Sequence, residues 1–253
     1  MSYETIELTV EENGVATVLL NRPQSRNALN VRMCSELVSV TEQIEQDERI
    51  RVVVFRGAGP AFCAGADLKE RKDMTLSDMT ARRVAGFAAY DAIEKLSRPA
   101  IALVHGPAFG SGCEIIAACD FAWATPEATF RYPEVSWGTV GATQRISRIA
   151  GIRIAKELLF SGRVFDAQQA REYGLINRIV PQDTIAEQLL QMAGEIANAK
   201  PLTVRLTKHS INAGVETTRE GAMAIELLAI EKNLRNSDWK SAISTFGSSV
   251  KGA

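Results

Sequence analysis

The sequence predicts an α/β protein in which strands and helices alternate along the chain. Apolar runs at 51–56 and 100–105 are typical of buried strands, and each is followed by a turn of small residues. Helical apolar periodicity at 30–46 precedes the first run and a second helical pattern at 75–97 separates the two runs; this second helix must end before Pro99. Strands and helices that alternate in this way favour a layered α/β architecture.

A β-hairpin is predicted at the N-terminal end. Residues 4–10 and 14–20 alternate or run apolar on either side of Asn13-Gly14, a dipeptide that favours tight hairpin turns. The second strand ends at Asn21-Arg22-Pro23, because proline cannot donate a hydrogen bond to a neighbouring strand.

After Gly151 the pattern becomes mainly helical, and we expect a core at 1–190 and a C-terminal helical oligomerisation region at 191–253. The segment 222–230 is apolar on nearly every side, so it must be covered either by its own subunit or by another copy of the chain. We favour self-association. The expected helices are 151–160, 166–173, 183–199, 202–213 and 216–235. Short strand-like pieces are expected at 162–165 and 176–180.

Composition excludes several classes of protein. The chain has 253 residues, of which 46% are hydrophobic and 23% charged, and a net charge of −1, which argues against a nucleic-acid or anionic-membrane surface. No apolar run reaches the roughly 18 residues of a membrane span, and residues 1–5 carry no secretory signal pattern. We therefore expect a cytoplasmic protein.

Four cysteines and two histidines form no metal-binding or disulfide pattern, so we expect no metal and four reduced, mostly buried thiols. Cys63 is the one exception to weigh because it lies inside the first turn of small residues, and the lack of a histidine nearby in the sequence argues against a nucleophile. We expect His105 to be packed in the core. The cysteines are Cys34, Cys63, Cys113 and Cys119, and the other histidine is His209.

Two turns of small residues form a matched pair, at 61–67 and 106–114. Each follows a strand-like run and leads into a helical pattern. The start of a helix leaves backbone N–H groups without internal partners, so two such starts can direct two donors at one oxygen. That is the geometry of an oxyanion hole, and it indicates an enzyme that acts on an acyl group.

Two glutamates are candidates for proton transfer. Glu114 lies in the first turn of an otherwise apolar helix, where desolvation raises a carboxyl pKa, although backbone N–H groups at the helix start could equally satisfy it. Glu134 follows Pro133 among aromatic residues, and its alternative role is a surface ion pair with Arg131. Sequence spacing alone does not bring the two glutamates together.

The chain resembles the enoyl-CoA hydratase/isomerase family, also called the crotonase superfamily, over about residues 5–235. The resemblance rests on many motifs in the same order. They are Asn21-Arg22-Pro23, Asn27-Ala28-Leu29-Asn30, Phe62-Cys63-Ala64-Gly65-Ala66-Asp67-Leu68-Lys69, Gly110-Ser111-Gly112-Cys113-Glu114, Cys119-Asp120, Pro133-Glu134, Thr143-Gln144-Arg145, Ala155-Lys156-Glu157-Leu158, Ala170 and Gly174-Leu175-Ile176.

The resemblance implies a crotonase-like spiral of ββα units with two roughly perpendicular sheets and a C-terminal helical region that builds homotrimers or dimers of trimers. It also implies an acyl-CoA thioester as substrate. Coenzyme A is then part of the substrate, and no separate cofactor is expected.

The resemblance also implies the roles of individual residues. The thioester carbonyl is expected between the backbone N–H groups of Ala66 and Ser111. Glu114 is expected to activate water for attack at C3, and Glu134 to protonate C2. Coenzyme A and the substrate are expected to contact Arg26, Ala28, Ala64, Asp67, Leu68 and Pro133, with Arg26 chemically suited to phosphate.

Members of the family that hydrate 2-enoyl-CoA carry two glutamates, and this chain has both, at Glu114 and Glu134. The resemblance therefore favours a 2-enoyl-CoA hydratase over an isomerase, another acyl-CoA enzyme of the family, or an acyl-CoA-binding paralogue with weakened catalysis. One departure bears on this choice. The loop 138–142 is about two residues shorter than in typical hydratases, where it helps to enclose the acyl pocket.

Overall fold

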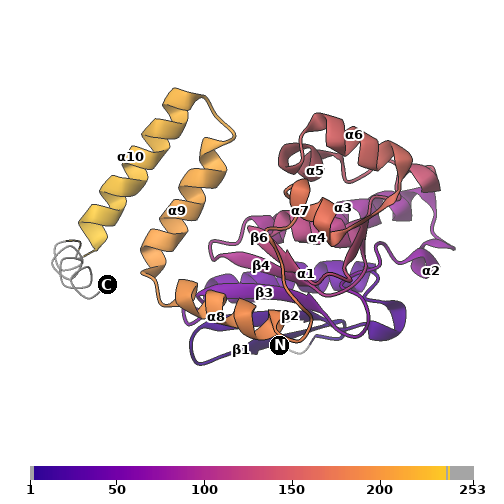
Figure 1. Ribbon diagram of the computed structural model, residues 1–253, viewed down its shortest axis with the longest axis horizontal. Helices are drawn as coiled ribbons and strands as arrows, with labels where there is room; N and C mark the ends of the chain where they lie inside the picture. The colour runs from indigo at the N-terminus through magenta and orange to yellow at the C-terminus, as the bar shows by residue number, and fades with distance from the viewer. Residues whose placement is uncertain (1–2, 238, 240–253) are drawn as a thin grey trace. The chain divides into compact units, whose positions relative to one another are not determined.

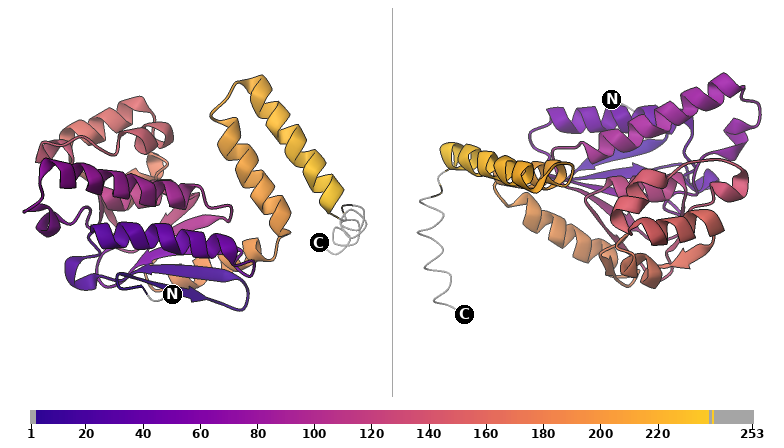
Figure 2. Two further views of the ribbon diagram at one scale, coloured as in Figure 1. Left: turned by 180° about the vertical axis from the view of Figure 1, so that it is seen from behind. Right: turned by 90° about the horizontal axis from the view of Figure 1, so that it is seen from above.

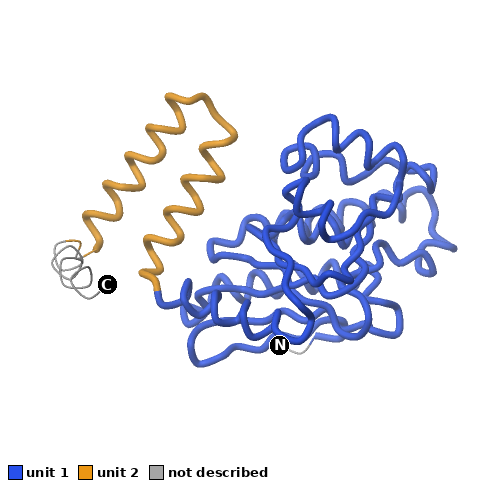
Figure 3. Tube along the Cα trace, viewed as in Figure 1, with its two compact units in different colours: residues 1–198 blue, residues 199–253 orange. Residues whose placement is uncertain are grey.

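The computed structural model describes residues 3–237 and Trp239, which form parts of two compact units, residues 1–198 and 199–253 (Figure 3). The predicted boundary at residue 190 falls inside a helix, Ile185–Ala197, that belongs to the first unit. The candidate residues of both turns and both glutamates also lie in the first unit. It therefore contains everything that the sequence singles out for chemistry.

The first unit is built on a six-stranded sheet with the strand order β1-β2-β3-β4-β6-β9 (Figure 1). The predicted hairpin is confirmed, since β1 and β2 pair antiparallel with Val10 opposite Ala16. The other neighbouring strands are parallel. The strands are β1 (Ile6–Val10), β2 (Val15–Leu20), β3 (Val52–Gly57), β4 (Ala100–Val104), β6 (Phe121–Ala124) and β9 (Arg178–Ile179).

Both faces of this sheet are buried, which explains why β3 and β4 are almost continuously apolar. Alternate side chains point to opposite faces: Val53 and Phe55 lie in one hydrophobic cluster, and Val52 and Val54 lie in another. The first cluster is covered by α1, α3 and α4, and the second by α8. Figure 2 shows α1 and α3 side by side on the same face.

The helices begin where the sequence places capping residues. Asn30 accepts a hydrogen bond from the Met33 amide, and Thr75 and Asp78 form a capping box. The helices are α1 (Val31–Gln46), α2 (Leu68–Arg71), α3 (Leu76–Glu94), α4 (Ser111–Ala118), α5 (Thr143–Ile149), α6 (Ile152–Ser161), α7 (Ala167–Glu172) and α8 (Ile185–Ala197), with short 3-10 helices at Pro23–Ser25 and Val135–Trp137.

A second, three-stranded sheet has the order β5-β7-β8, formed by β5 (Ala108–Phe109), β7 (Thr129–Arg131) and β8 (Val164–Asp166). The sequence pattern had indicated only β8. Strands of two or three residues are too short to show an alternation of apolar and polar positions. This sheet matters for the site because β5 begins inside the second turn and β7 leads directly to Glu134.

The second unit contains α9 (Pro201–Gly214) and α10 (Arg219–Asn236), which pack against each other. Thr203 donates a hydrogen bond to Asn233 between them. Neither helix has a buried residue. No helix among residues 3–237 and Trp239 is both long and apolar enough to cross a membrane.

Candidate active site

The two small-residue turns lie side by side. The amides of Phe62 and Cys63 donate to the carbonyl of Pro107 at 3.1 and 3.2 Å, and the amide of Phe109 donates to the carbonyl of Cys63 at 2.9 Å. A Cβ atom on Gly112 would overlap the Cys63 carbonyl oxygen, so this approach requires glycine. Two segments 45 residues apart in the sequence are thus joined by backbone hydrogen bonds into one unit.

The amide of Ala66 is left free in the first turn. Leu29 runs parallel to this turn: its amide donates to the carbonyl of Gly65 at 2.7 Å, and its carbonyl accepts from the amide of Asp67 at 3.0 Å. In a parallel pairing the residue between those two groups directs its own N–H to the opposite side. Among the described residues, no acceptor is recorded for the Ala66 amide, and Ala66 lines the pocket of the site.

The amide of Ser111 is free for a different reason. Ser111 is the first residue of α4, where intrahelical acceptors for N–H groups do not exist. The preceding Gly110 has φ = 47°, a left-handed value that favours glycine, and its amide donates to Arg131 at 2.8 Å. Ser111 also lines the pocket. The serine leaves the backbone donor intact.

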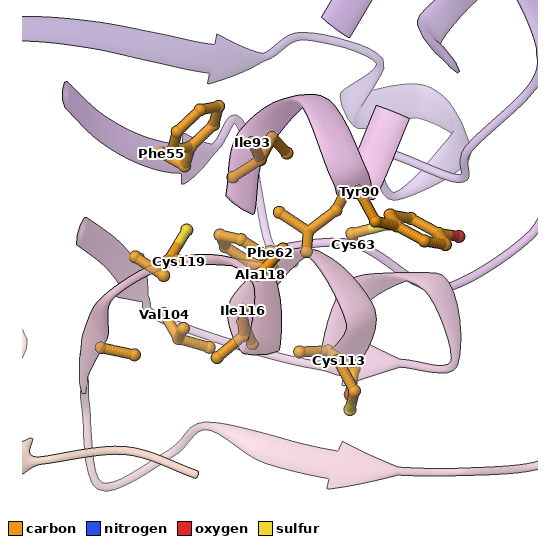
Figure 4. Close-up of a cluster of buried hydrophobic side chains, with 14 of the residues drawn as sticks. Phe55, Phe62, Cys63, Tyr90, Ile93, Val104, Cys113, Ile116, Ala118 and Cys119 are labelled. Carbon is orange, nitrogen blue, oxygen red and sulfur yellow. The ribbon is translucent and has the colours of Figure 1, made fainter. Parts of the chain in front are cut away.

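Buried side chains from both turns belong to one hydrophobic cluster, among them Phe62, Cys63 and Cys113 (Figure 4). Cys63 and Cys113 belong to this cluster, and all four cysteines are free and buried, as predicted. Burial raises the pKa of the Cys63 thiol to about 12. A thiol with such a pKa is protonated at neutral pH, so Cys63 is not a nucleophile.

Glu114 lies in the first turn of α4 and is only 5% exposed. Burial raises its pKa, and the attraction of Arg145 opposes that rise. Its Oε2 accepts from Arg145 at 3.2 Å, while its Oε1 has no hydrogen-bond partner. The alternative in which backbone N–H groups satisfy this carboxylate is therefore wrong, and one oxygen remains available for chemistry.

Arg145 is held in place from several sides. It donates to Glu94 at the end of α3 with distances of 2.5 and 3.0 Å, and its guanidinium lies 5.8 Å from the ring centre of Tyr90. Glu114 is thus fixed by a cation that α3 orients. Arg145 was recognised only as part of the motif Thr143-Gln144-Arg145, since α5 itself was not predicted.

Glu134 lies between β7 and the short 3-10 helix at Val135–Trp137. Burial raises its pKa, its own backbone N–H and the charge of Arg83 oppose the rise, and its Oε2 has no hydrogen-bond partner. The alternative of an ion pair with Arg131 is wrong, because Arg131 donates instead to the carbonyl of Gly162 at 2.6 Å. A Cβ atom on Gly110 would lie 2.9 Å from Glu134 Oε1, so the Glu134 carboxylate lies against the start of the helix that carries Glu114. The charge of Glu134 also contributes to the raised pKa of Glu114.

The shortened loop after Glu134 is held by hydrogen bonds to its own start. The amides of Trp137 and Thr139 donate to the carbonyl of Glu134 at 3.1 and 3.0 Å, and Arg83 on α3 donates to the Thr139 hydroxyl. Ala142 closes the loop with φ = 55°, a strained value for alanine. Trp137 and Thr139 line the pocket, so the short loop still forms one of its walls.

The pocket brings together several of the residues predicted from the sequence. Ala64, Ala66, Leu68, Ser111, Pro133 and Glu134 line it, whereas Arg26, Ala28, Asp67 and Glu114 are not among its lining residues.

The residues outside the pocket lie next to the first turn. The carbonyl of exposed Arg26 accepts from the amide of Ala64, and Arg22 binds both the carbonyl of Ala28 and the carboxylate of Asp67. Asp67 also caps α2 by accepting from the amides of Lys69 and Glu70. Burial opposes its ionisation, but the Arg22 hydrogen bond prevails and lowers its pKa. The Asp67 side chain therefore supports the turn.

His105 is not packed in the core as expected. It is half-buried just after β4, and its Nε2 lies 2.8 Å from the carbonyl oxygen of Gly59. The strand ends at Val104, so His105 lies just beyond the C-terminal end of β4. It does not line the pocket.

Sequence reasoning missed the face of α3 that closes the pocket. Arg82, Gly86 and Tyr90 are buried at intervals of four residues and line it. This spacing marks one side of a helix, so it was a usable signal, although only one of the three residues is strongly apolar.

Two amides without a recorded acceptor and two carboxylates with raised pKa values, one buried and one half-buried, are typical of a site for acid–base chemistry on an acyl group. Comparisons with known proteins agree with this class. A family model described as enoyl-CoA hydratase/isomerase matches residues 10–251. The chain belongs to this family.

Individual relatives match along nearly the whole chain. A probable mitochondrial enoyl-CoA hydratase 2 of Arabidopsis thaliana is 36% identical over 96% of this chain and 82% of its own length, and a short-chain-enoyl-CoA hydratase of Clostridium acetobutylicum is 35% identical over 93% and 92%. The crystal structure of an enoyl-CoA hydratase from Bacillus anthracis superposes with a TM-score of 0.94 at 33% identity, covering 97% of both chains. The predicted crotonase-like α/β fold is confirmed.

Proposed function

We propose that the chain is an enoyl-CoA hydratase, which adds water across the double bond of a 2-enoyl-CoA thioester. The observation that carries this proposal is the pair of carboxylates, buried Glu114 and half-buried Glu134, each with a buried oxygen that has no partner in the described structure. Addition of water requires one group that accepts a proton and one that donates it. Relatives that are named hydratases support the same conclusion.

The free amides of Ala66 and Ser111 would form the oxyanion hole. They would donate to the thioester carbonyl oxygen, and the negative charge that develops there when C3 is attacked would strengthen both hydrogen bonds. Donors of this kind are fixed before the reaction, so no reorganisation opposes them in the transition state. Electron withdrawal through the carbonyl makes C3 electrophilic.

Glu114 acts as the base in this proposal. Its Oε1 accepts a proton from water as the water oxygen bonds to C3, and the ionised form that this step requires is favoured by Arg145, which opposes the rise in pKa that burial causes. The electron pair of the double bond passes to C2 and the carbonyl. Glu134, whose burial favours the protonated form, then delivers a proton to C2. Water is consumed and no cofactor takes part, because coenzyme A belongs to the substrate.

The first test is direct. Purified protein is mixed with crotonyl-CoA and with longer, branched and aromatic 2-enoyl-CoA thioesters, and loss of the conjugated thioester is followed by absorbance. Hydration of at least one thioester is expected. An isomerase would instead move the double bond of a 3-enoyl-CoA without adding water, and a binding paralogue would bind acyl-CoA without turnover.

We also propose that the chain assembles as a homotrimer or a dimer of trimers through its second unit. Large apolar side chains of α9 and α10 are exposed there, including Val215 at 76% and Leu228 at 65%. A groove between the two helices is lined partly by Leu206, Ile211 and Ile230. Apolar surface of this extent in one helical pair is characteristic of a protein interface.

Light scattering at several concentrations tests the assembly. The expected mass is three or six times that of one chain, and Leu228→Glu should reduce it, whereas Lys232→Glu on the same helix serves as a charge-changing control at an exposed polar position. A monomer that retains full activity would contradict the proposal.

A cytoplasmic location is proposed because all four cysteines are free, as is usual in a reducing compartment. Some relatives are named as mitochondrial proteins. Cell fractionation with an antibody against the protein distinguishes the two locations.

A further inference from the structure

The pocket carries a strong local excess of positive charge. Arg71, Arg82, Arg83 and Arg131 line it, and Glu134 is the only carboxylate among its lining residues. The whole chain, by contrast, has a net charge of −1. Positive charge is therefore concentrated on the surface that faces a bound acyl group.

Arg82 is the most deeply buried of these arginines, with a side chain that is 5% exposed. It donates to the carbonyl of Leu29, and its Nε lies 3.4 Å from Glu70 without a well-aligned hydrogen bond. The carboxylate of Glu70 also accepts from the amide of Val31. Glu70 thus offsets the charge of Arg82 in part.

Arg71 has no carboxylate partner recorded among residues 3–237 and Trp239. It lies half-buried at the end of α2. Burial lowers its pKa, and the charges of Arg82 and Arg83 lower it further. Three cations are close enough to repel one another, which is unfavourable unless an anion lies among them.

Arg83 places this positive cluster on the acyl side of the pocket. It donates to Thr139 in the loop that follows Glu134, and a Cβ on Gly141 would contact both the Arg83 guanidinium and the Glu134 side chain. Arg83 is therefore next to the group that is proposed to protonate C2. Exposed Phe87 and Trp137 line the same region and supply apolar contact for the intervening chain.

From this arrangement we infer that the preferred substrates are 2-enoyl-CoA thioesters whose acyl chain ends in a carboxylate, with Arg71 and Arg83 as the residues that recognise it. A purely hydrocarbon tail would desolvate the guanidinium groups and offer them no hydrogen bonds, whereas a carboxylate can accept two from one guanidinium. This inference rests on the proposed function, because it names the substrate of the same site.

Binding of saturated thioesters tests the inference without requiring turnover. Titration calorimetry compares hexanoyl-CoA with its 5-carboxypentanoyl counterpart, which has the same number of carbons. The carboxylated thioester is expected to bind at least about tenfold more tightly, the range typical of a hydrogen bond to a charged group. Equal binding, or tighter binding of hexanoyl-CoA, overturns the inference.

Variants identify the residue responsible. Arg71→Met should remove about tenfold or more of this preference, Arg71→Lys should retain part of it, and Lys72→Met removes an exposed cation next along the chain and should leave the preference unchanged. Free coenzyme A is titrated in parallel. If Arg71→Met weakens both thioesters and coenzyme A equally, the arginines bind coenzyme A phosphates and the inference is wrong.

Turnover then separates this inference from the proposed function. The enzyme is expected to hydrate 5-carboxypent-2-enoyl-CoA with a higher kcat/KM than hex-2-enoyl-CoA. If neither thioester is hydrated while the binding preference persists, the hydratase proposal fails and the carboxylate-binding pocket stands. If both thioesters are hydrated at equal rates and bound equally tightly, the hydratase proposal stands and the inference of a carboxylate-binding pocket fails.

Discussion

The first turn of α4 carries a buried glutamate and the loop that follows β7 carries a half-buried one, and the two regions hold them by different means. Glu114 belongs to α4, whose apolar residues pack in the hydrophobic core, and Arg145 donates a hydrogen bond to one oxygen of the Glu114 carboxylate. Glu134 belongs to a loop of residues 133–142 that is held by backbone hydrogen bonds and by Arg83 through Thr139. The pKa is raised by burial in both cases.

The difference between the two regions is the nearby cation. Arg145 contacts the Glu114 carboxylate directly and favours its ionised form, whereas no ion pair of Glu134 is recorded in the described structure. Burial raises the pKa of both carboxylates, but only at Glu114 does a direct ion pair with an arginine oppose the rise. This difference is the basis for proposing Glu114 as the base and Glu134 as the acid, and the following changes test it.

The largest effect is expected from removing either carboxylate. Glu114→Gln and Glu134→Gln should each lower kcat by about 10²–10⁴, the usual contribution of acid–base catalysis, because glutamine keeps the shape but cannot transfer a proton. Steady-state kinetics with a hydrated substrate and calorimetry with a saturated acyl-CoA provide the readouts, and binding should change little.

The double variant of these glutamates should be only slightly slower than either single one, since the two groups act on one reaction as a unit. Hydration that survives Glu134→Gln within a few-fold would contradict its role as the acid, which is also the result expected of an isomerase that uses Glu114 alone. Survival of hydration in both single variants would contradict the hydratase proposal.

The proposed oxyanion amides act on the thioester carbonyl whichever glutamate is the base and whichever is the acid. Loss of an amide should therefore slow the reaction in either case. Ala66→Pro removes one N–H donor and should lower the rate by about 10²–10³. Ala66→Gly and Ser111→Ala keep their backbone donors and should remain within a few-fold of wild type. A folded, fully active Ala66→Pro protein would show that this amide has no catalytic part.

Arg145→Met tests the proposed reason for the difference between the glutamates. Arg145 lowers the pKa of Glu114, so its loss should raise that pKa and shift the acid limb of the kcat/KM profile to higher pH. Activity should fall more at low pH than at high pH. Arg148→Met, which changes an exposed arginine on the same helix, is the control, and an unchanged acid limb in Arg145→Met would remove this explanation.

The smallest effect is expected where the loop of Glu134 ends. Ala142 has φ = 55°, a conformation that is unfavourable for alanine by about 1–2 kcal/mol, and glycine removes this strain. Glycine also has more conformational freedom in the unfolded chain, which lowers the free energy of unfolding by about 0.4–1 kcal/mol. Ala142→Gly should therefore raise the free energy of unfolding by about 1 kcal/mol, measured by urea denaturation. A decrease would show that the loop gains no strain from this residue.

Much of the site could be predicted because its chemistry lies in local patterns. The turns at 61–67 and 106–114 have short motifs whose backbone geometry follows from small residues, and Glu114 lies within one of them. The long helices and strands were also predicted to within a few residues, since their apolar periodicity extends over many positions.

The rest depends on contacts between distant segments. Arg145 reaches Glu114 only because α5 packs on α4, and α5 is a seven-residue helix with weak periodicity. The arginines of the pocket come from α2, α3 and β7, so no short stretch of sequence displays their charge. His105 was misplaced because a strand that ends one residue earlier changes the burial of its side chain.

The hydrogen bonds that join the two turns divide recognition into a fixed part and an adjustable part. Cys63 and Phe109 tie the amide-bearing loops to each other, so the spacing of the two donors cannot be altered without moving β3 and β4. Arg71 at the end of α2 and exposed Phe87 on α3 line the pocket but take no part in these backbone hydrogen bonds. Substitutions at those two positions are therefore expected to change which acyl tail is preferred while the proposed contacts to the thioester carbonyl stay the same.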